Sequence, residues 1–113
     1  MPDLNLDCTA LRTEIEKIAK FWYDKGIRGY RLDAALHYYE GNNEKSTEAL
    51  KWFYDYVESL DSSNYVVAEV WSDASALDKF YKSGVDSLFN FPYGTSEGYI
   101  CLLYTSPSPR DRR

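Results

Sequence analysis

Apolar side chains recur at helical spacing in three stretches of the 113-residue chain. In the first stretch, about residues 9–25, they follow one another at steps of four, three and four, which places them on one face of a helix: Leu11, Ile15, Ile18 and Trp22. The second stretch begins at Asn43 or Ser46 and ends at Leu60, and the third runs from Asp73 to Gly84. Asp73 is typical of a helix start and Gly84 of a helix end. The pattern therefore predicts three helices.

Each predicted helix is followed by a short segment typical of a β-strand, at residues 27–33, 65–71 and 85–91. The second segment, YVVAEVW, is β-branched and almost continuously apolar, which is typical of a strand buried on both faces of a parallel sheet. We expect Tyr30 and residues 89–91 to lie in the core. Helices and strands that alternate with short connections predict an α/β fold with a parallel sheet.

Three strands are few for a parallel sheet, because both edges would expose backbone groups and apolar faces would stay uncovered. We therefore expect residues 1–100 to be part of a larger domain. A half-sized doubly wound domain is the alternative, and it would need at least one more strand than the pattern provides.

The C-terminal residues break with this pattern. The string CLLYTSPSPRD, from Cys101 to Asp111, resembles the translation of a sequencing adapter. We therefore expect residues 101–113 to be a non-native, adapter-derived tail that follows the domain fragment of residues 1–100. A disordered natural tail is the alternative.

Composition and charge narrow the classes of function. The chain is 44% hydrophobic and 27% charged with a mean hydropathy of -0.53, values typical of globular proteins. No stretch approaches the roughly 20 apolar residues of a membrane span, and the N-terminus does not resemble a targeting signal, so the sequence leaves the location in the cell open. A net charge of -5, with no basic cluster before the last four residues, argues against a nucleic-acid partner.

Two acidic residues lie at the carboxyl ends of consecutive predicted strands. Asp33 closes the first strand, and Glu69 lies near the end of the second, one helix-and-strand step later. Active sites of α/β barrels lie at this end of the sheet, and neighbouring strands are about 4.8 Å apart. The two carboxylates can therefore approach to roughly 5–5.5 Å, the separation of a nucleophile and an acid/base in a retaining glycosidase.

Arg31 strengthens this interpretation. It precedes Asp33 by two positions, so on an extended strand both side chains face the same side, and the guanidinium can keep Asp33 ionised through charge-assisted hydrogen bonds. The alternatives are a structural salt bridge for Arg31 and a helix cap or solvated loop position for each acid.

Three strings carry a resemblance to a known family. MPDLN at residues 1–5, GYRLDAALH at 29–37 and AEVW at 68–71 resemble, in order and spacing, three signature regions of the α-amylase family of glycoside hydrolases. The resemblance implies a partial (β/α)8 TIM barrel, comprising about the fourth to the sixth strands and the helices before them. It makes Asp33 the covalent nucleophile, Glu69 the general acid/base, and Arg31 the arginine of the strand that carries the nucleophile.

The resemblance also implies a substrate and further contacts. MPDLN resembles the group between oligo-1,6-glucosidases and neopullulanases, so we expect an α-glucan or maltooligosaccharide with α-1,4 and also α-1,6 bonds. His37 matches a position near the substrate and, in some members, near a structural calcium ion, whereas the chemistry itself needs no cofactor and we expect no metal ligands in this chain. Trp71 and Tyr38 are further candidates for binding sugar, with packing as the alternative. Leu36 stands where many amylases have lysine.

Other functions stay open as alternatives. The family's third catalytic carboxylate comes from a seventh strand that this chain does not reach, so we expect the fragment itself to be inactive. A transglycosylase or α-glucosidase of the same family would use the same residues. A non-catalytic relative is disfavoured because both acids are present, and a phosphate-binding α/β domain is disfavoured because no glycine-rich loop follows any strand.

Overall fold

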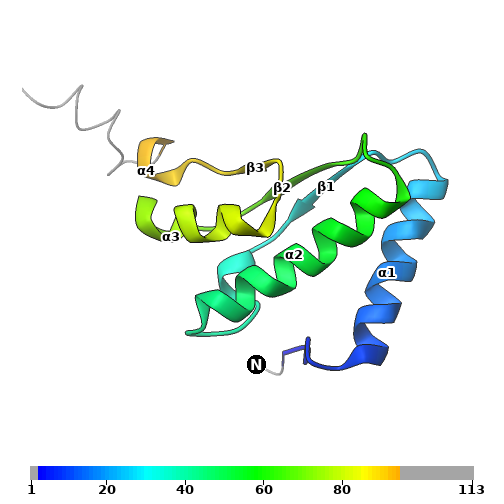
Figure 1. Ribbon diagram of the computed structural model, residues 1–113, viewed down its shortest axis with the longest axis horizontal. Helices are drawn as coiled ribbons and strands as arrows, with labels where there is room; N and C mark the ends of the chain where they lie inside the picture. Colours follow the sequence, from blue (N-terminus) through cyan, green and yellow to red (C-terminus); the bar gives the residue numbers. More distant parts are fainter. Residues whose placement is uncertain (1–2, 95–113) are drawn as a thin grey trace, which may run out of the picture.

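The computed structural model describes residues 3–94, which form an α/β unit with one small parallel sheet (Figure 1). In chain order the elements are α1 (Thr9–Asp24), β1 (Gly29–Leu32), the 3-10 helix η1 (Ala35–His37), α2 (Asn43–Leu60), β2 (Tyr65–Ala68), α3 (Ala74–Phe80), the 3-10 helix η2 (Tyr81–Ser83), β3 (Ser87–Leu88) and α4 (Phe91–Gly94). This order confirms the predicted alternation of helices and strands.

Local signals in the sequence account for the starts of α2 and α3 and for the turn after η2. The side chain of Asn42 accepts a hydrogen bond of 3.0 Å from the backbone N–H of Lys45 at the start of α2, and Asp73 accepts one of 2.9 Å from Ala76 at the start of α3. The turn after η2 reverses at Gly84, whose φ of 89° lies in the left-handed region. The predicted start of the third helix at Asp73 is therefore confirmed, whereas α3 itself ends at Phe80 and Gly84 follows the 3-10 helix η2.

The face that α1 turns to the core differs from the prediction. Ala19 is buried and Ile15 packs against the core, but Ile18 and Trp22 are 58% and 51% exposed. The rotation follows from the helix's partners, because the Tyr30 hydroxyl on β1 donates a hydrogen bond of 2.9 Å to the carbonyl of Ala19. The most apolar stripe of this helix is thus turned partly away from α2 and β1.

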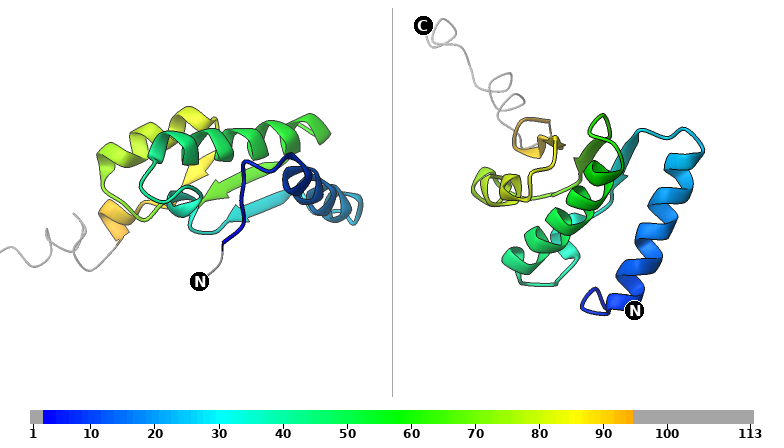
Figure 2. Two further views of the ribbon diagram at one scale, coloured as in Figure 1. Left: turned by 90° about the horizontal axis from the view of Figure 1, so that it is seen from below. Right: turned by 45° about the vertical axis from the view of Figure 1, so that its right-hand side comes forward.

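The three strands are parallel in the order β1-β2-β3, and α2 and α3 form a layer over one face of the sheet (Figure 2). Side chains alternate between the faces, and those turned to the helices make the core together with α2 and α3: Tyr30, Leu32, Val66, Ala68, Val70 and Leu88. On the opposite face Tyr65 and Trp71 are exposed. The expectation that this segment is buried on both faces is therefore wrong for this chain, as is the expected core position of Phe89, which is also exposed.

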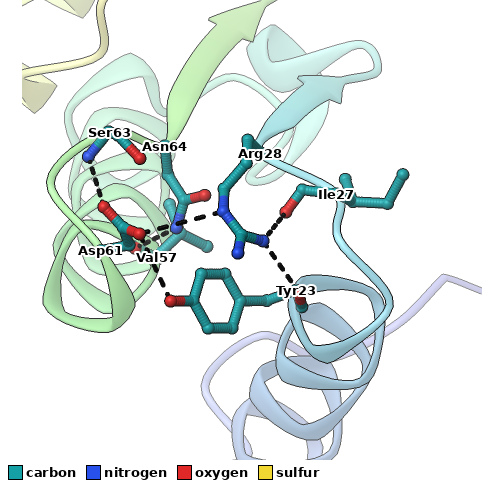
Figure 3. A network of polar contacts seen from close by, with 7 residues as sticks. All are labelled: Tyr23, Ile27, Arg28, Val57, Asp61, Ser63 and Asn64. Atoms are coloured by element: carbon teal, nitrogen blue, oxygen red, sulfur yellow. Dashed lines mark hydrogen bonds and ion pairs between the residues drawn. The ribbon is translucent and has the colours of Figure 1, made fainter.

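A polar network around Asp61 ties the helices to the amino ends of the strands (Figure 3). The Asp61 carboxylate accepts hydrogen bonds from the Ser63 backbone at 2.8 Å and from the Tyr23 hydroxyl at 3.3 Å, and it lies 3.8 Å from Nε of Arg28. The bond from Ser63 chiefly, with Tyr23 and Arg28, lowers the pKa of Asp61. The network joins α1, β1 and the turn after α2 at the end of the sheet opposite to Asp33 and Glu69.

Two further expectations concern the C-terminal residues and membrane-spanning helices. The division between residues 1–100 and 101–113 lies outside the described residues and stays a prediction. Among residues 3–94, no helix is both long enough and apolar enough to cross a membrane.

Candidate active site

The pairing of β1 with β2 brings the two predicted catalytic acids together. Leu32 pairs with Ala68, so the next residues along the two strands are Asp33 and Glu69. The backbone continues this alignment beyond the strands, because the N–H of Glu69 donates to the carbonyl of Leu32 and the N–H of Ala35 donates to the carbonyl of Glu69, both at 2.8 Å. The two acids are thus neighbours at the carboxyl ends of adjacent strands, as the sequence predicts.

The chain turns sharply immediately after Asp33. Ala34 has φ 45° and ψ 44°, the left-handed conformation that costs a residue with a Cβ about 1–2 kcal/mol. This turn ends β1 and begins η1, and it aims the N–H of the buried Ala35 at Glu69. Strained backbone of this kind persists where surrounding contacts hold it, and it is frequent at functional sites.

One arginine nitrogen contacts both carboxylates. Nη2 of Arg31 lies 3.1 Å from Oδ1 of Asp33 and is hydrogen-bonded to Oε2 of Glu69. Two oxygens that share one donor nitrogen cannot be further apart than two hydrogen-bond lengths, about 6 Å. Carboxyl pairs of inverting glycosidases are roughly 6.5–9.5 Å apart, whereas those of retaining enzymes are about 5–5.5 Å apart. The contact of one nitrogen with an oxygen of each carboxylate fits the shorter separation.

The two carboxylates differ in their exposure to solvent. The side chain of Asp33 is 76% exposed and that of Glu69 is 22% exposed. A glycosidase needs one carboxylate that is ionised and one carboxylic acid that holds a proton, and the two roles require different surroundings. The less exposed residue here is the one to which the sequence assigns the acid/base role.

A hollow of about 440 Å³ opens beside the acid/base candidate. It is lined by Ala34, Leu36, His37, Glu69 and Trp71. This volume lies within the range of small-ligand sites, roughly 300–1,000 Å³. His37 pairs through Nδ1 with Glu40 at 2.9 Å, and Trp71 is 65% exposed. The structure thus brings His37 and Trp71, both predicted to bind substrate, to one hollow with Glu69.

Tyr38 lies outside the hollow that Glu69 and Trp71 line. It is half-buried, packs against the core and lines a separate hollow of about 240 Å³ near the N-terminal segment, which His37 also borders. Burial, and secondarily the charge of Asp33, raises the pKa of Tyr38 to about 12, so its hydroxyl is protonated at neutral pH. The hollow with Glu69 does not include Tyr38, and its role in binding sugar stays a prediction.

Sequence reasoning missed two contributors to the site. Ser46 of α2 is fully buried, and its Oγ accepts a hydrogen bond of 3.0 Å from the Tyr39 backbone and lies 3.3 Å from the carbonyl of Leu36. It therefore holds the segment that carries His37 against α2. Phe91 stacks on Trp71, although the sequence suggested only a core position. A polar residue on the apolar face of α2 was the available signal for Ser46.

Comparisons with known proteins agree with this geometry. Residues 1–98 match the family described as "Alpha amylase, catalytic domain". "Alpha-amylase 3" of Dictyoglomus thermophilum is 47% identical over 92 residues, which cover 81% of this chain and 18% of that protein. "Oligo-1,6-glucosidase" of a Bacillus species is 35% identical over 114 residues, which cover 95% of this chain and 20% of that protein.

The solved structure of Eubacterium rectale Amy13B superposes with a TM-score of 0.90 at 38% identity, over 96% of this chain and 21% of that one. The chain thus spans about a fifth of the length of these relatives. Its three parallel strands and their helices are part of a (β/α)8 TIM barrel, which confirms the predicted fold class. The chain belongs to the α-amylase family of glycoside hydrolases.

Proposed function

We propose that the whole protein containing this chain hydrolyses α-glucans or maltooligosaccharides with retention of configuration at the anomeric carbon. The observation that carries this proposal is the contact of one Arg31 nitrogen with an oxygen of Asp33 and an oxygen of Glu69, which supports two carboxylates as close as those of a retaining pair. Relatives named α-amylase and oligo-1,6-glucosidase support substrates with α-1,4 and α-1,6 bonds.

The proposed reaction has two displacements. In the first, Glu69 gives its proton to the glycosidic oxygen as that bond breaks, while an oxygen of Asp33 attacks the anomeric carbon and forms a glycosyl ester. In the second, the Glu69 carboxylate takes a proton from water, the water oxygen attacks the anomeric carbon, and the ester bond to Asp33 breaks. Two inversions at one carbon give net retention.

Arg31 has a specific part in this sequence of steps. While both acids are ionised, its guanidinium offsets the repulsion between two nearby negative charges. When Glu69 takes up a proton, the charge that attracts Arg31 to it disappears, and the guanidinium stays with Asp33. We therefore propose that protonation of Glu69 directs Arg31 to the nucleophile.

The hollow beside Glu69 is the proposed sugar site. The exposed indole of Trp71 offers a flat apolar surface for a sugar ring, and His37 adds a polar group to the lining. Leu36 adds an apolar surface to this hollow, where many amylases have a lysine. We keep Tyr38 as a candidate contact for substrate that reaches the second hollow.

The proposed chemistry asks for no cofactor, because the two carboxylates supply the nucleophile, the acid and the base. A structural calcium ion of the kind found in some family members takes about six to eight oxygen ligands. Among residues 3–94, no three His, Cys, Asp or Glu side chains form a cluster that could hold a metal ion.

Two substitutions in the whole protein test the assignment. Glu69→Gln should reduce the hydrolysis of maltooligosaccharide by about 10²–10⁴-fold but should spare an aryl glycoside, since an activated leaving group needs little protonation. Asp33→Asn should abolish the hydrolysis of both substrates, because it removes the nucleophile. Steady-state kinetics on the two substrates, with melting curves to check the fold, measure this.

Glu58→Gln is the matched control, because Glu58 is an exposed acid on α2. It should leave the kinetics unchanged. Near wild-type rates for Asp33→Asn would show that Asp33 is not the nucleophile.

A further inference from the structure

The indole of Trp71 is stacked on the ring of Phe91. The two ring centroids are 4.5 Å apart and the ring planes are inclined by 15°. Phe91 is half-buried at the start of α4, whereas Trp71 remains 65% exposed. Phe91 therefore covers one face of the indole, and Trp71 also lines the hollow that it shares with Glu69.

The pairing of the strands accounts for this contact. Ala68 pairs with Leu88, so one residue further along each chain Glu69 is aligned with Phe89, and the N–H of Phe89 donates to the carbonyl of Ala68 at 3.2 Å. Two residues beyond that point on each segment stand Trp71, after the end of β2, and Phe91, at the start of α4, whose rings are in contact. The pairing of β2 with β3 thus brings the segments that carry Trp71 and Phe91 side by side.

We propose that Phe91 is a positioning residue for Trp71: it holds the indole by stacking on one face, so that the other face serves as the platform for a sugar ring. This inference rests on the proposed function of the site. An exposed tryptophan without such a partner would sample several rotamers, and ordering it on binding would cost affinity. Aromatic pairs of this kind contribute about 0.5–1.5 kcal/mol, which corresponds to roughly 2- to 10-fold in affinity.

The test measures binding of maltoheptaose to the whole protein in an Asp33→Asn background, so that no turnover is needed. Phe91→Met keeps an apolar side chain of similar size but removes the flat ring. It should weaken binding about 2- to 10-fold where Trp71 is present, and by less than about twofold in a Trp71→Ala background. Phe91→Tyr, which keeps the ring, should bind within about twofold of Phe91.

The decisive result is that Phe91→Met weakens binding more with Trp71 present than in the Trp71→Ala background, because a general loss of structure would weaken binding equally in both. An equal loss with and without Trp71, or no loss with Trp71 present, would overturn the proposal. Phe21→Leu is the matched control, since Phe21 also contacts a tryptophan, Trp22, at 5.2 Å between ring centroids, but lies on α1 away from the site. A protein that binds maltoheptaose as expected but does not hydrolyse it without the Asp33 substitution would refute the proposed function and leave this inference standing.

Discussion

Arg31 shows how much of the site's chemistry a single side chain organises. Its planar guanidinium presents several N–H donors in a rigid fork, so it can contact two carboxylates on neighbouring strands from one position. A lysine would supply the charge but not this geometry. The sequence predicted the contact between Arg31 and Asp33 from strand alternation, but the contact with Glu69 depends on strand register, which the one-dimensional pattern does not contain.

Ala34, the residue after the proposed nucleophile Asp33, has a left-handed backbone conformation. Ala34→Gly should leave the free energy of unfolding unchanged or slightly higher. Glycine adopts the left-handed conformation freely, which stabilises the folded state by about 1–2 kcal/mol. The greater entropy that glycine gives the unfolded chain costs less, about 0.4–1 kcal/mol. Ala34→Val should lower it by at least about 1 kcal/mol, because a β-branched residue fits this conformation worse. Denaturant unfolding of the whole protein measures both, and a stable Ala34→Val variant would argue against strain at this turn.

At the scale of elements, η1 depends on α2 for its position. Ser46→Ala should lower the free energy of unfolding by about 1–3 kcal/mol, because it removes the fully buried hydroxyl that accepts a hydrogen bond from the part-buried N–H of Tyr39. It should also raise KM, since the segment it holds carries His37. Ser59→Ala on the exposed face of α2 is the control and should change stability by less than about 0.5 kcal/mol. Equal effects of the two substitutions would mean that Ser46 does not hold this segment.

The order and type of the elements could be predicted from the sequence, because helix periods, caps such as Asp73 and turn glycines such as Gly84 are local signals. Which face of α1 is buried could not be predicted from the sequence. Its stripe of large apolar residues includes Ile18 and Trp22, but the contacts of Ala19 and Ile15 with the rest of the unit decide which face is buried. A short residue on the core side lets the helix approach closely, and hydrophobicity alone does not report that.

The sequence predicted some residues of the candidate site and missed others. Asp33, Glu69, His37 and Trp71 stand in strings that resemble family signatures, and the structure places them around one end of the sheet. The contact of Phe91 with Trp71 was not predicted, because it joins the start of α4 to the segment that follows β2, 20 residues earlier in the chain. Contacts of this kind become visible only when the register of the sheet is known.

At the scale of the whole molecule, the described unit leaves much apolar surface uncovered. Within residues 3–94, β1 and β3 pair on one side only, and α1 exposes Ile18, Phe21 and Trp22. Residues 1–100 expressed alone should therefore fold poorly, bind a hydrophobic dye and hydrolyse no α-glucan, because burial in the unit does not offset the loss of chain entropy. Calorimetry, dye fluorescence and a starch assay measure this, and a cooperative melt together with starch hydrolysis would contradict it.

The central claim is that Asp33 and Glu69 form a retaining pair, and the anomer released first by the whole protein tests it most directly. Proton NMR can follow the anomeric signals of maltooligosaccharide products before mutarotation mixes them. Two displacements at the same carbon predict that the α anomer appears first and the β anomer grows in later. Release of the β anomer first would show a single displacement and would contradict the assignment of Asp33 as nucleophile.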